Sequence, residues 1–175
     1  MENFIGSSLE DKILKIVNRN KGLLVMGKAI EHNVYLVDKH DTIHVIPVPK
    51  EKFLTNEEYK HLFRGLLKST IKSLEKAGTR IAELFYLEDT YFNPKAIGLE
   101  DLNLDYGFNR YNGNECLLVY REDKLNMEIT VFDKISGSDN VGRYTVLSEN
   151  PLTQLDYSKI DPDDNLGGAL TNILR

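Results

Sequence analysis

The sequence predicts an α+β fold, and two observations carry this prediction. Apolar residues recur at helical spacing in two stretches, one near the N-terminus and one over residues 54–78. Most other apolar residues fall in short runs bounded by Gly, Pro, Asn or Asp, a pattern typical of strands joined by tight turns. We therefore predict an N-terminal helix, a three-stranded antiparallel meander, a long amphipathic helix, a second antiparallel β unit and an extended C-terminal arm.

The chain of 175 residues predicts a single domain, which we place at residues 1–148, with the arm over residues 149–175. A hydrophobic content of 41% is sufficient for a core and excludes global disorder. The one cysteine, Cys116, excludes an intramolecular disulfide and is typical of a reducing compartment. No apolar run is long enough to span a bilayer, and no secretory signal stands at the N-terminus. We expect a cytoplasmic protein, or one assembled in the cytoplasm into a particle, with no membrane partner.

The N-terminal helix is predicted to begin at Ser7 or Ser8 and to end at Gly22. Each serine precedes an acidic residue by three positions, an arrangement that favours an N-cap. The apolar stripe of the helix is formed by Leu9, Ile13, Ile16 and Val17.

Three short strands are predicted next, over Leu23–Ile30, Val34–Val37 and Thr42–Val48. Only a few residues connect them, so antiparallel pairing is expected. Pro47 and Pro49 cannot donate hydrogen bonds to a ladder, which places the third strand at a sheet edge or ends it there.

The long amphipathic helix, Leu54–Gly78, has the clearest signals in the sequence. Thr55 and Glu58 match an S/T-x-x-E capping box, and Gly78 stands where a helix ends. An apolar arc is predicted to face the core, formed by Tyr59, Leu62, Phe63, Leu66, Leu67, Thr70, Ile71 and Leu74.

A row of cations follows this helix at intervals of four residues, formed by Lys60, Arg64, Lys68, Lys72 and Lys76. We interpret this row first as a solvated face, because like charges at this spacing repel weakly. Contact with an acidic protein surface is the alternative, because residues 1–78 carry a net charge of +3 and residues 79–175 carry −8. The overall charge of −5 and the lack of interleaved aromatic residues argue against nucleic acid as the partner.

A line of small residues, Gly65, Ser69 and Ser73, borders the apolar arc. Small side chains let another helix or strand approach closely. We predict that the line packs inside the fold, with a groove for a partner as the alternative.

The second half of the chain has weaker signals. Residues 79–92 are predicted to be helical, with a strand as the alternative, and residues 93–114 to be a long irregular connection. Strands are predicted over Glu115–Tyr120, Met127–Phe132 and Arg143–Leu147. A short helix over Leu166–Leu174 is predicted to close the arm.

The apolar residues of the arm must dock either on their own domain or on a neighbouring subunit. The residues concerned are Leu152, Leu155, Tyr157 and Ile160. Together with the cation row, they are the candidate partner-binding residues.

No catalytic residue and no cofactor are predicted. His32, His40 and His44 are weak candidates for metal ligands, but they fall in separate turns and a strand, so their convergence is not expected. Glu122-x-Lys124 matches part of a nuclease pattern but stands in a predicted turn. The acidic run from Asp161 lacks the glycine and glutamate of a calcium loop. Phosphate-loop, dinucleotide and nucleophile-elbow motifs are absent.

These observations favour a non-catalytic structural or assembly protein that contacts copies of itself or a larger protein complex. The predicted element order is loosely similar to that of small phage tail-terminator and head–tail completion subunits, although no motif is shared. That similarity implies a virion subunit as the specific version of the hypothesis. The alternatives are a regulatory or inhibitory module that binds a protein or small ligand, and a metal-dependent hydrolase.

Overall fold

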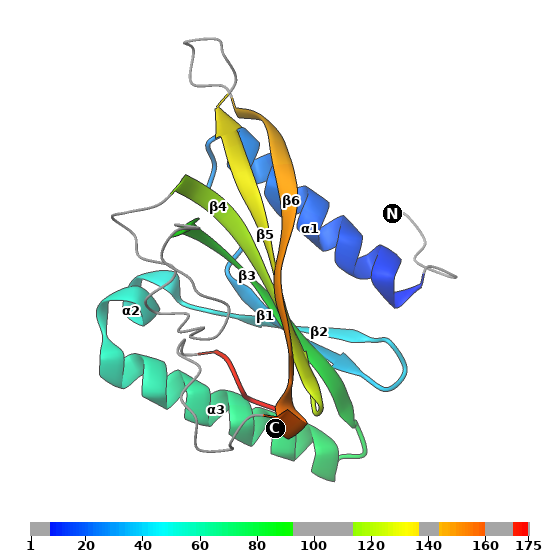
Figure 1. Ribbon diagram of the computed structural model, residues 1–175. Coiled ribbons are helices and arrows are strands. Elements are labelled where there is room, and N and C mark those ends of the chain that lie inside the picture. Colours follow the sequence, from blue (N-terminus) through cyan, green and yellow to red (C-terminus); the bar gives the residue numbers. More distant parts are fainter. Residues whose placement is uncertain (1–7, 93–113, 137–143, 160–169, 175) are drawn as a thin grey trace, which may run out of the picture.

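The computed structural model describes residues 8–92, 114–136, 144–159 and 170–174. Within these residues the chain forms one twisted antiparallel sheet of six strands, in the order β2-β1-β3-β4-β5-β6 (Figure 1). The strands are β1 Asn33–Asp38, β2 Ile43–Pro47, β3 Ile81–Phe92, β4 Asn114–Asp123, β5 Asn126–Ser136 and β6 Tyr144–Asp156. The helices are α1 Leu9–Val25, α2 Lys50–Thr55 and α3 Glu57–Lys76, with a 3-10 turn, η1, over Tyr157–Lys159. The predicted α+β class is confirmed.

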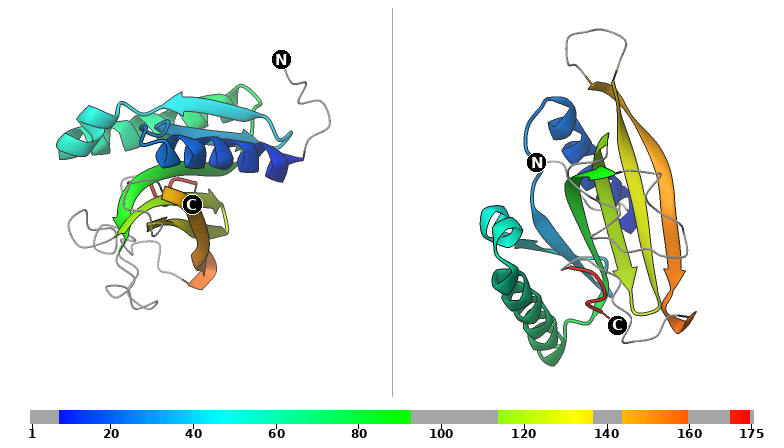
Figure 2. Two further views of the ribbon diagram at one scale, coloured as in Figure 1. Left: turned by 90° about the horizontal axis from the view of Figure 1, so that it is seen from above. Right: turned by 60° about the vertical axis from the view of Figure 1, so that its left-hand side comes forward.

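The two long helices cover opposite faces of the sheet (Figure 2). On one face, α1 buries Ile13, Val17 and Leu24 against residues such as Tyr35 and Phe85. On the other, α3 buries the residues Phe63, Leu67 and Ile71 against Leu36, Leu84, Tyr120 and Ile129, among others. Successive strand residues point to alternate faces of the sheet. Since a helix covers each face, the central strands carry apolar residues on both sides.

The helix α1 begins as predicted but ends three residues later. The Ser8 hydroxyl accepts a hydrogen bond from the Asp11 amide, and the Asp11 carboxylate accepts one from the Ser8 amide, which completes a capping box. Gly22 lies inside the helix, and the buried Leu24 continues the apolar stripe seven residues after Val17. The core contact made by this last turn outweighs the low helix propensity of glycine.

The predicted strand Leu23–Ile30 is therefore wrong, because its first three residues belong to α1 and Gly27 turns the chain at a φ of +70°. The expected three-stranded meander is a two-stranded hairpin, in which β1 pairs with β2. The other neighbour of β1 is β3, which follows α3 in the chain. β2 lies at an edge of the sheet, as its prolines predicted.

The predicted helix Leu54–Gly78 is two helices. Thr55 ends α2, and its hydroxyl donates a hydrogen bond to the Glu51 carbonyl, so the predicted Thr55 cap is wrong. The N-cap of α3 is Asn56, whose side chain accepts a hydrogen bond from the Tyr59 amide. The chain leaves α3 at Gly78, where φ is +92°, as predicted.

The segment after α3 is a strand and not the favoured helix. Leu84 and Tyr86 face α3, whereas Phe85 and Leu87 face α1. A strand that is buried on both faces reads as a continuous apolar run, and periodicity alone does not distinguish it from a helix. A register shift against Val37 and Asp38 turns Ile81 toward the same face as Leu84.

The three strands predicted for the second β unit are present and longer than predicted, but they belong to the same sheet as β1 and β2. β4 and β5 are joined by a tight turn in which the Asp123 carboxylate accepts hydrogen bonds from the amides of Leu125 and Asn126. Residues 149–156, assigned to the arm, form the second half of β6. β6 accommodates Pro151 because this residue lies opposite Thr130 at a register shift in an edge strand.

The end of the chain packs into its own core. Leu170, Ile173 and Leu174 are buried among residues from the α3 face of the sheet. The predicted helix Leu166–Leu174 is absent from the part that the structure describes, residues 170–174, and its first four residues lie outside the described ranges. The connection over residues 93–113 also lies outside them.

Candidate functional site

The exposed side of α3 carries apolar residues that were predicted to be buried. Leu62 and Leu66 are 58% and 55% exposed, because the helix contacts the sheet along the single row of Phe63, Leu67 and Ile71. Tyr59 and Leu74 are partly buried against the same core. The predicted apolar arc is therefore too wide.

The two exposed leucines share one side of the helix with the predicted line of small residues. We call this side the α3 outer face, and it consists of Leu62, Gly65, Leu66, Ser69 and Ser73. All five residues are exposed, and a Cβ atom added at Gly65 would meet no atom within 4 Å. The prediction that the small residues pack inside the fold is wrong, and the alternative, a groove for a partner, stays a prediction.

The five cations of the row differ in the partners that their side chains contact. Lys60 pairs with Glu57 on its own helix at 2.7 Å. Arg64 donates hydrogen bonds to the backbone carbonyls of Thr171 and Asn172, the second at 2.8 Å. Arg64 thus holds residues 170–174 of its own chain, which we call the C-terminal segment.

The three other cations of the row are exposed. Desolvation and the neighbouring Arg64 lower the pKa of Lys68. Lys72 and Lys76 form no ion pair with any residue that the structure describes. Contact with a partner stays a prediction, and it now concerns only this C-terminal half of the row.

The C-terminal segment is also held by a buried carboxylate. The Glu122 side chain accepts hydrogen bonds from the amides of Ile173 and Leu174 at 2.6 and 3.0 Å. It accepts two more from the hydroxyls of Tyr157 and Tyr120, at 2.5 and 3.0 Å. Burial raises the pKa of Glu122, and the four hydrogen bonds oppose this rise.

These contacts assign structural roles to two residues that the sequence had suggested for function. Glu122 is only 1% exposed, and its carboxylate accepts hydrogen bonds from backbone amides and tyrosine hydroxyls. Lys124 lies on the surface, 3.9 Å from Glu75.

Tyr157 is buried in the core and is not available to a partner. Of the other predicted contact residues in the arm, Leu152 and Leu155 belong to β6, and Ile160 lies outside the described residues.

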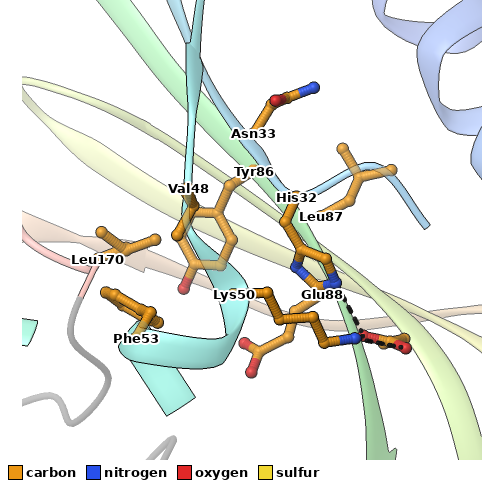
Figure 3. A pocket seen from close by; sticks show the side chains of 10 residues that line it. His32, Asn33, Val48, Lys50, Phe53, Tyr86, Leu87, Glu88 and Leu170 are labelled. Atoms are coloured by element: carbon orange, nitrogen blue, oxygen red, sulfur yellow. Dashed lines mark hydrogen bonds and ion pairs between the residues drawn. The ribbon is translucent and has the colours of Figure 1, made fainter. Parts of the chain in front are cut away.

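A small cavity lies between α2, the start of β1 and the middle of β3 (Figure 3). Its apolar wall includes Val48, Phe53 and Leu170, and His32, Lys50 and Asp89 form its polar end. The cavity volume is about 50 Å³, which is sufficient for a few water molecules and well below the volume of a substrate pocket.

The polar end of this cavity is an ion pair beside His32. Lys50 Nζ lies 3.1 and 3.3 Å from the two carboxylate oxygens of Asp89. His32 Nε2 lies 3.5 Å from Asp89 Oδ1 and makes no hydrogen bond. Burial and the charge of Lys50 lower the pKa of His32, and Asp89 opposes this effect.

The other two candidate histidines lie at the opposite end of β1. His44 Nε2 is 2.9 Å from Asp38 Oδ2, and the amides of His40 and Thr42 donate to Asp38 Oδ1. Burial raises the pKa of Asp38, but these hydrogen bonds outweigh burial and hold the pKa below its ordinary value. Asp38 therefore fixes the turn between β1 and β2.

The structure does not bring the three histidines together. Across the described ranges, no group of three or more His, Cys, Asp or Glu side chains is placed to hold a metal ion. Cys116 is buried in the core. The surface that stands out is the α3 outer face, and the sequence signal for it was the line of small residues beside Leu62 and Leu66.

Comparisons with known proteins do not assign this chain to a family. No protein-family model matches it, and no curated protein or solved structure was found to be similar to it. Among the helices of the described residues, none is long and apolar enough to cross a membrane. Function must therefore be inferred from the surface itself.

Proposed function

We propose that the protein is a non-catalytic assembly protein that binds a protein partner through the α3 outer face. The observation that carries this proposal is the exposure of Leu62 and Leu66, one helical turn apart, on a helix whose opposite side is anchored in the core. Large apolar side chains one turn apart on one side of a helix are the anchors that a helix uses when it binds in the groove of a partner. The small residues around them leave room for the partner to approach closely.

The other side chains considered for function support a binding role rather than catalysis. Glu122, Asp38 and Arg64 are each used to hold a turn or a chain segment. The cavity at His32 has room for water but not for a substrate. The phage-virion version of the proposal rests on element order alone and stays a prediction.

The experiment compares a double variant, Leu62→Asp with Leu66→Asp, with the wild type in extracts of the native host. The mass of the species that contains each protein is measured by gel filtration with light scattering. We expect the wild type in a complex and the double variant as a monomer, because two carboxylates on this face oppose its desolvation. Leu14→Asp is the matched control, since Leu14 is 54% exposed on α1, and this variant should remain in the complex.

The double variant should keep the circular dichroism spectrum and unfolding midpoint of the wild type, because both leucines lie largely outside the core. A wild type that migrates as a free monomer in native extract would overturn the proposal. A complex that the double variant retains unchanged would move the contact to another surface and also overturn it.

A further inference from the structure

We propose that the partner is a second copy of this chain, and that the two α3 helices pair antiparallel through their outer faces. This inference rests on the proposed use of that face. The two helices are related by a two-fold axis that passes between Leu66 and Ser69. In this register Leu66 of each copy lies opposite Ser69 of the other, and Leu62 lies opposite Ser73.

The size of the side chains supports this register. The N-terminal half of the α3 outer face carries the large residues, Leu62 and Leu66, whereas the C-terminal half carries the small ones, Ser69 and Ser73. Antiparallel pairing places each large side chain of one copy over a small side chain of the other. Helices that interdigitate in this way pack at interaxial distances of about 8–10 Å. A two-fold axis lets one face supply both halves of the contact.

Charge supports the same register independently. The first turn of α3 carries Glu57 and Glu58, and its last turn carries Lys76. Antiparallel pairing brings Glu58 of each copy beside Lys76 of the other, at both ends of the contact. Glu58 and Lys76 are exposed and form no ion pair with another described residue, so these charges are available. Helix dipoles in an antiparallel pair also oppose each other favourably.

Parallel pairing of the two helices would match neither the sizes nor the charges of the facing side chains. It places Leu62 on Leu62 and Ser73 on Ser73, which crowds one end of the contact and leaves the other end unfilled. It also places Glu58 near Glu58 and Lys76 near Lys76, where like charges repel. A partner of different sequence could use the same face, but nothing in the chain specifies one, whereas its own face provides the complement in size and in charge.

The experiment is a charge swap measured by sedimentation equilibrium of the purified full chain. Glu58→Lys and Lys76→Glu each place like charges at both ends of the homodimer, and we expect each variant to dimerise roughly ten-fold more weakly than the wild type. An equimolar mixture of the two variants forms a heterodimer in which every end pair has opposite charges. The mixture should therefore recover dimerisation to near the wild-type affinity.

Two controls separate this register from a general charge effect. Lys28→Glu and Glu128→Lys change the net charge in the same two ways at exposed positions outside α3 and should leave dimerisation unchanged. Raising the salt concentration should reduce the difference between the single variants and the wild type, because exposed charges are screened.

A wild type that is monomeric at all concentrations overturns this inference. If that monomer still enters a complex in native extract that Leu62→Asp with Leu66→Asp abolishes, the proposed function stands with a different partner. A dimer that the charge swap leaves unchanged overturns the antiparallel register. A dimer that the two aspartates also leave unchanged overturns both proposals, because the contact then uses another surface.

Discussion

The carboxylate of Glu122 accepts a hydrogen bond from the backbone amide of Ile173 at 2.6 Å, although 51 positions separate the two residues in the sequence. This contact fixes the C-terminal segment over the α3 face of the sheet. Tyr120 and Tyr157 complete the arrangement, since both hydroxyls donate to the same carboxylate, and the Tyr120 hydroxyl accepts from the Asn172 amide at 3.1 Å. A single buried side chain thus organises the end of the described chain.

Replacing Glu122 with alanine should destabilise the protein by about 3 kcal/mol. The substitution leaves two backbone amides and two tyrosine hydroxyls without their acceptor inside the core. Urea unfolding followed by circular dichroism measures the loss. Glu128→Ala on the neighbouring strand is the control, because Glu128 is exposed, and its effect should lie within about 0.5 kcal/mol. Equal effects of the two substitutions would contradict a structural role for Glu122.

The stability contributed by Glu122 should depend on pH with a defined sign. Its pKa in the folded protein is raised above the ordinary value of 4.5, so between these two values the folded state binds more protons than the unfolded state. This contribution is greatest below pH 4.5 and is lost as the pH rises through the folded pKa. The free-energy difference between the wild type and Glu122→Gln, measured across this range, should therefore fall with rising pH. A difference that rises with pH would mean that the four hydrogen bonds outweigh burial.

Removing Arg64 should loosen the C-terminal segment without unfolding the sheet. Its guanidinium donates to the carbonyls of Thr171 and Asn172, and the loss of these bonds should cost about 1–2 kcal/mol. In Arg64→Ala, amide hydrogen exchange should accelerate at Ile173 and Leu174 more than in the central strands. Lys72→Ala, two turns further along α3, is the matched control and should leave exchange unchanged. Uniform acceleration throughout the protein would contradict a local clamp.

His32 should titrate below its ordinary pKa of 6.5, because burial and Lys50 both disfavour its charged form. Lys50→Met should raise this pKa, since it removes the positive charge and leaves the Asp89 carboxylate to pair with the ring. NMR titration of the imidazole resonances measures both values. Lys52→Met, an exposed position on the same helix, should not change the pKa. Stability linked to His32 is present above pH 6.5 and is lost as the pH falls through the lowered pKa.

The sequence predicted the fold class, the start of α1 at Ser8 and the end of α3 near Gly78, although the local signals at Thr55 and Gly22 were misleading. Ser8 with Asp11 and the glycine at position 78 act within a few residues, so their effect is visible in the chain itself. Leu24 was assigned to a strand because Gly22 was expected to end the helix, and Phe85 was assigned to a helix because burial of a strand on both faces removes the alternating signal. Tertiary packing determines whether such segments are helices or strands.

The sequence predicted some of the residues of the candidate site and misassigned others. The line of Gly65, Ser69 and Ser73 was recognised as a possible groove, but Leu62 and Leu66 were assigned to the core. Sequence periodicity gives the width of an apolar arc and does not reveal how much of that arc the sheet covers. The role of Glu122 could not be predicted, because the Tyr157 hydroxyl and the Ile173 and Leu174 amides that donate to it lie 35 to 52 positions along the chain.

The order of the strands divides the sheet into two units, in each of which the strands pair in chain order. β1 and β2 form a hairpin that precedes α2 and α3, whereas β3, β4, β5 and β6 pair strictly in chain order. The two units are joined by one long-range strand pair, β1 with β3, whose residues, such as Leu36 and Leu84, lie about one quarter of the chain apart. Pairing between residues so far apart slows folding, because the entropy of closing the intervening chain is lost before the contacts form. We therefore expect the closing of this seam to contribute to a slow folding rate.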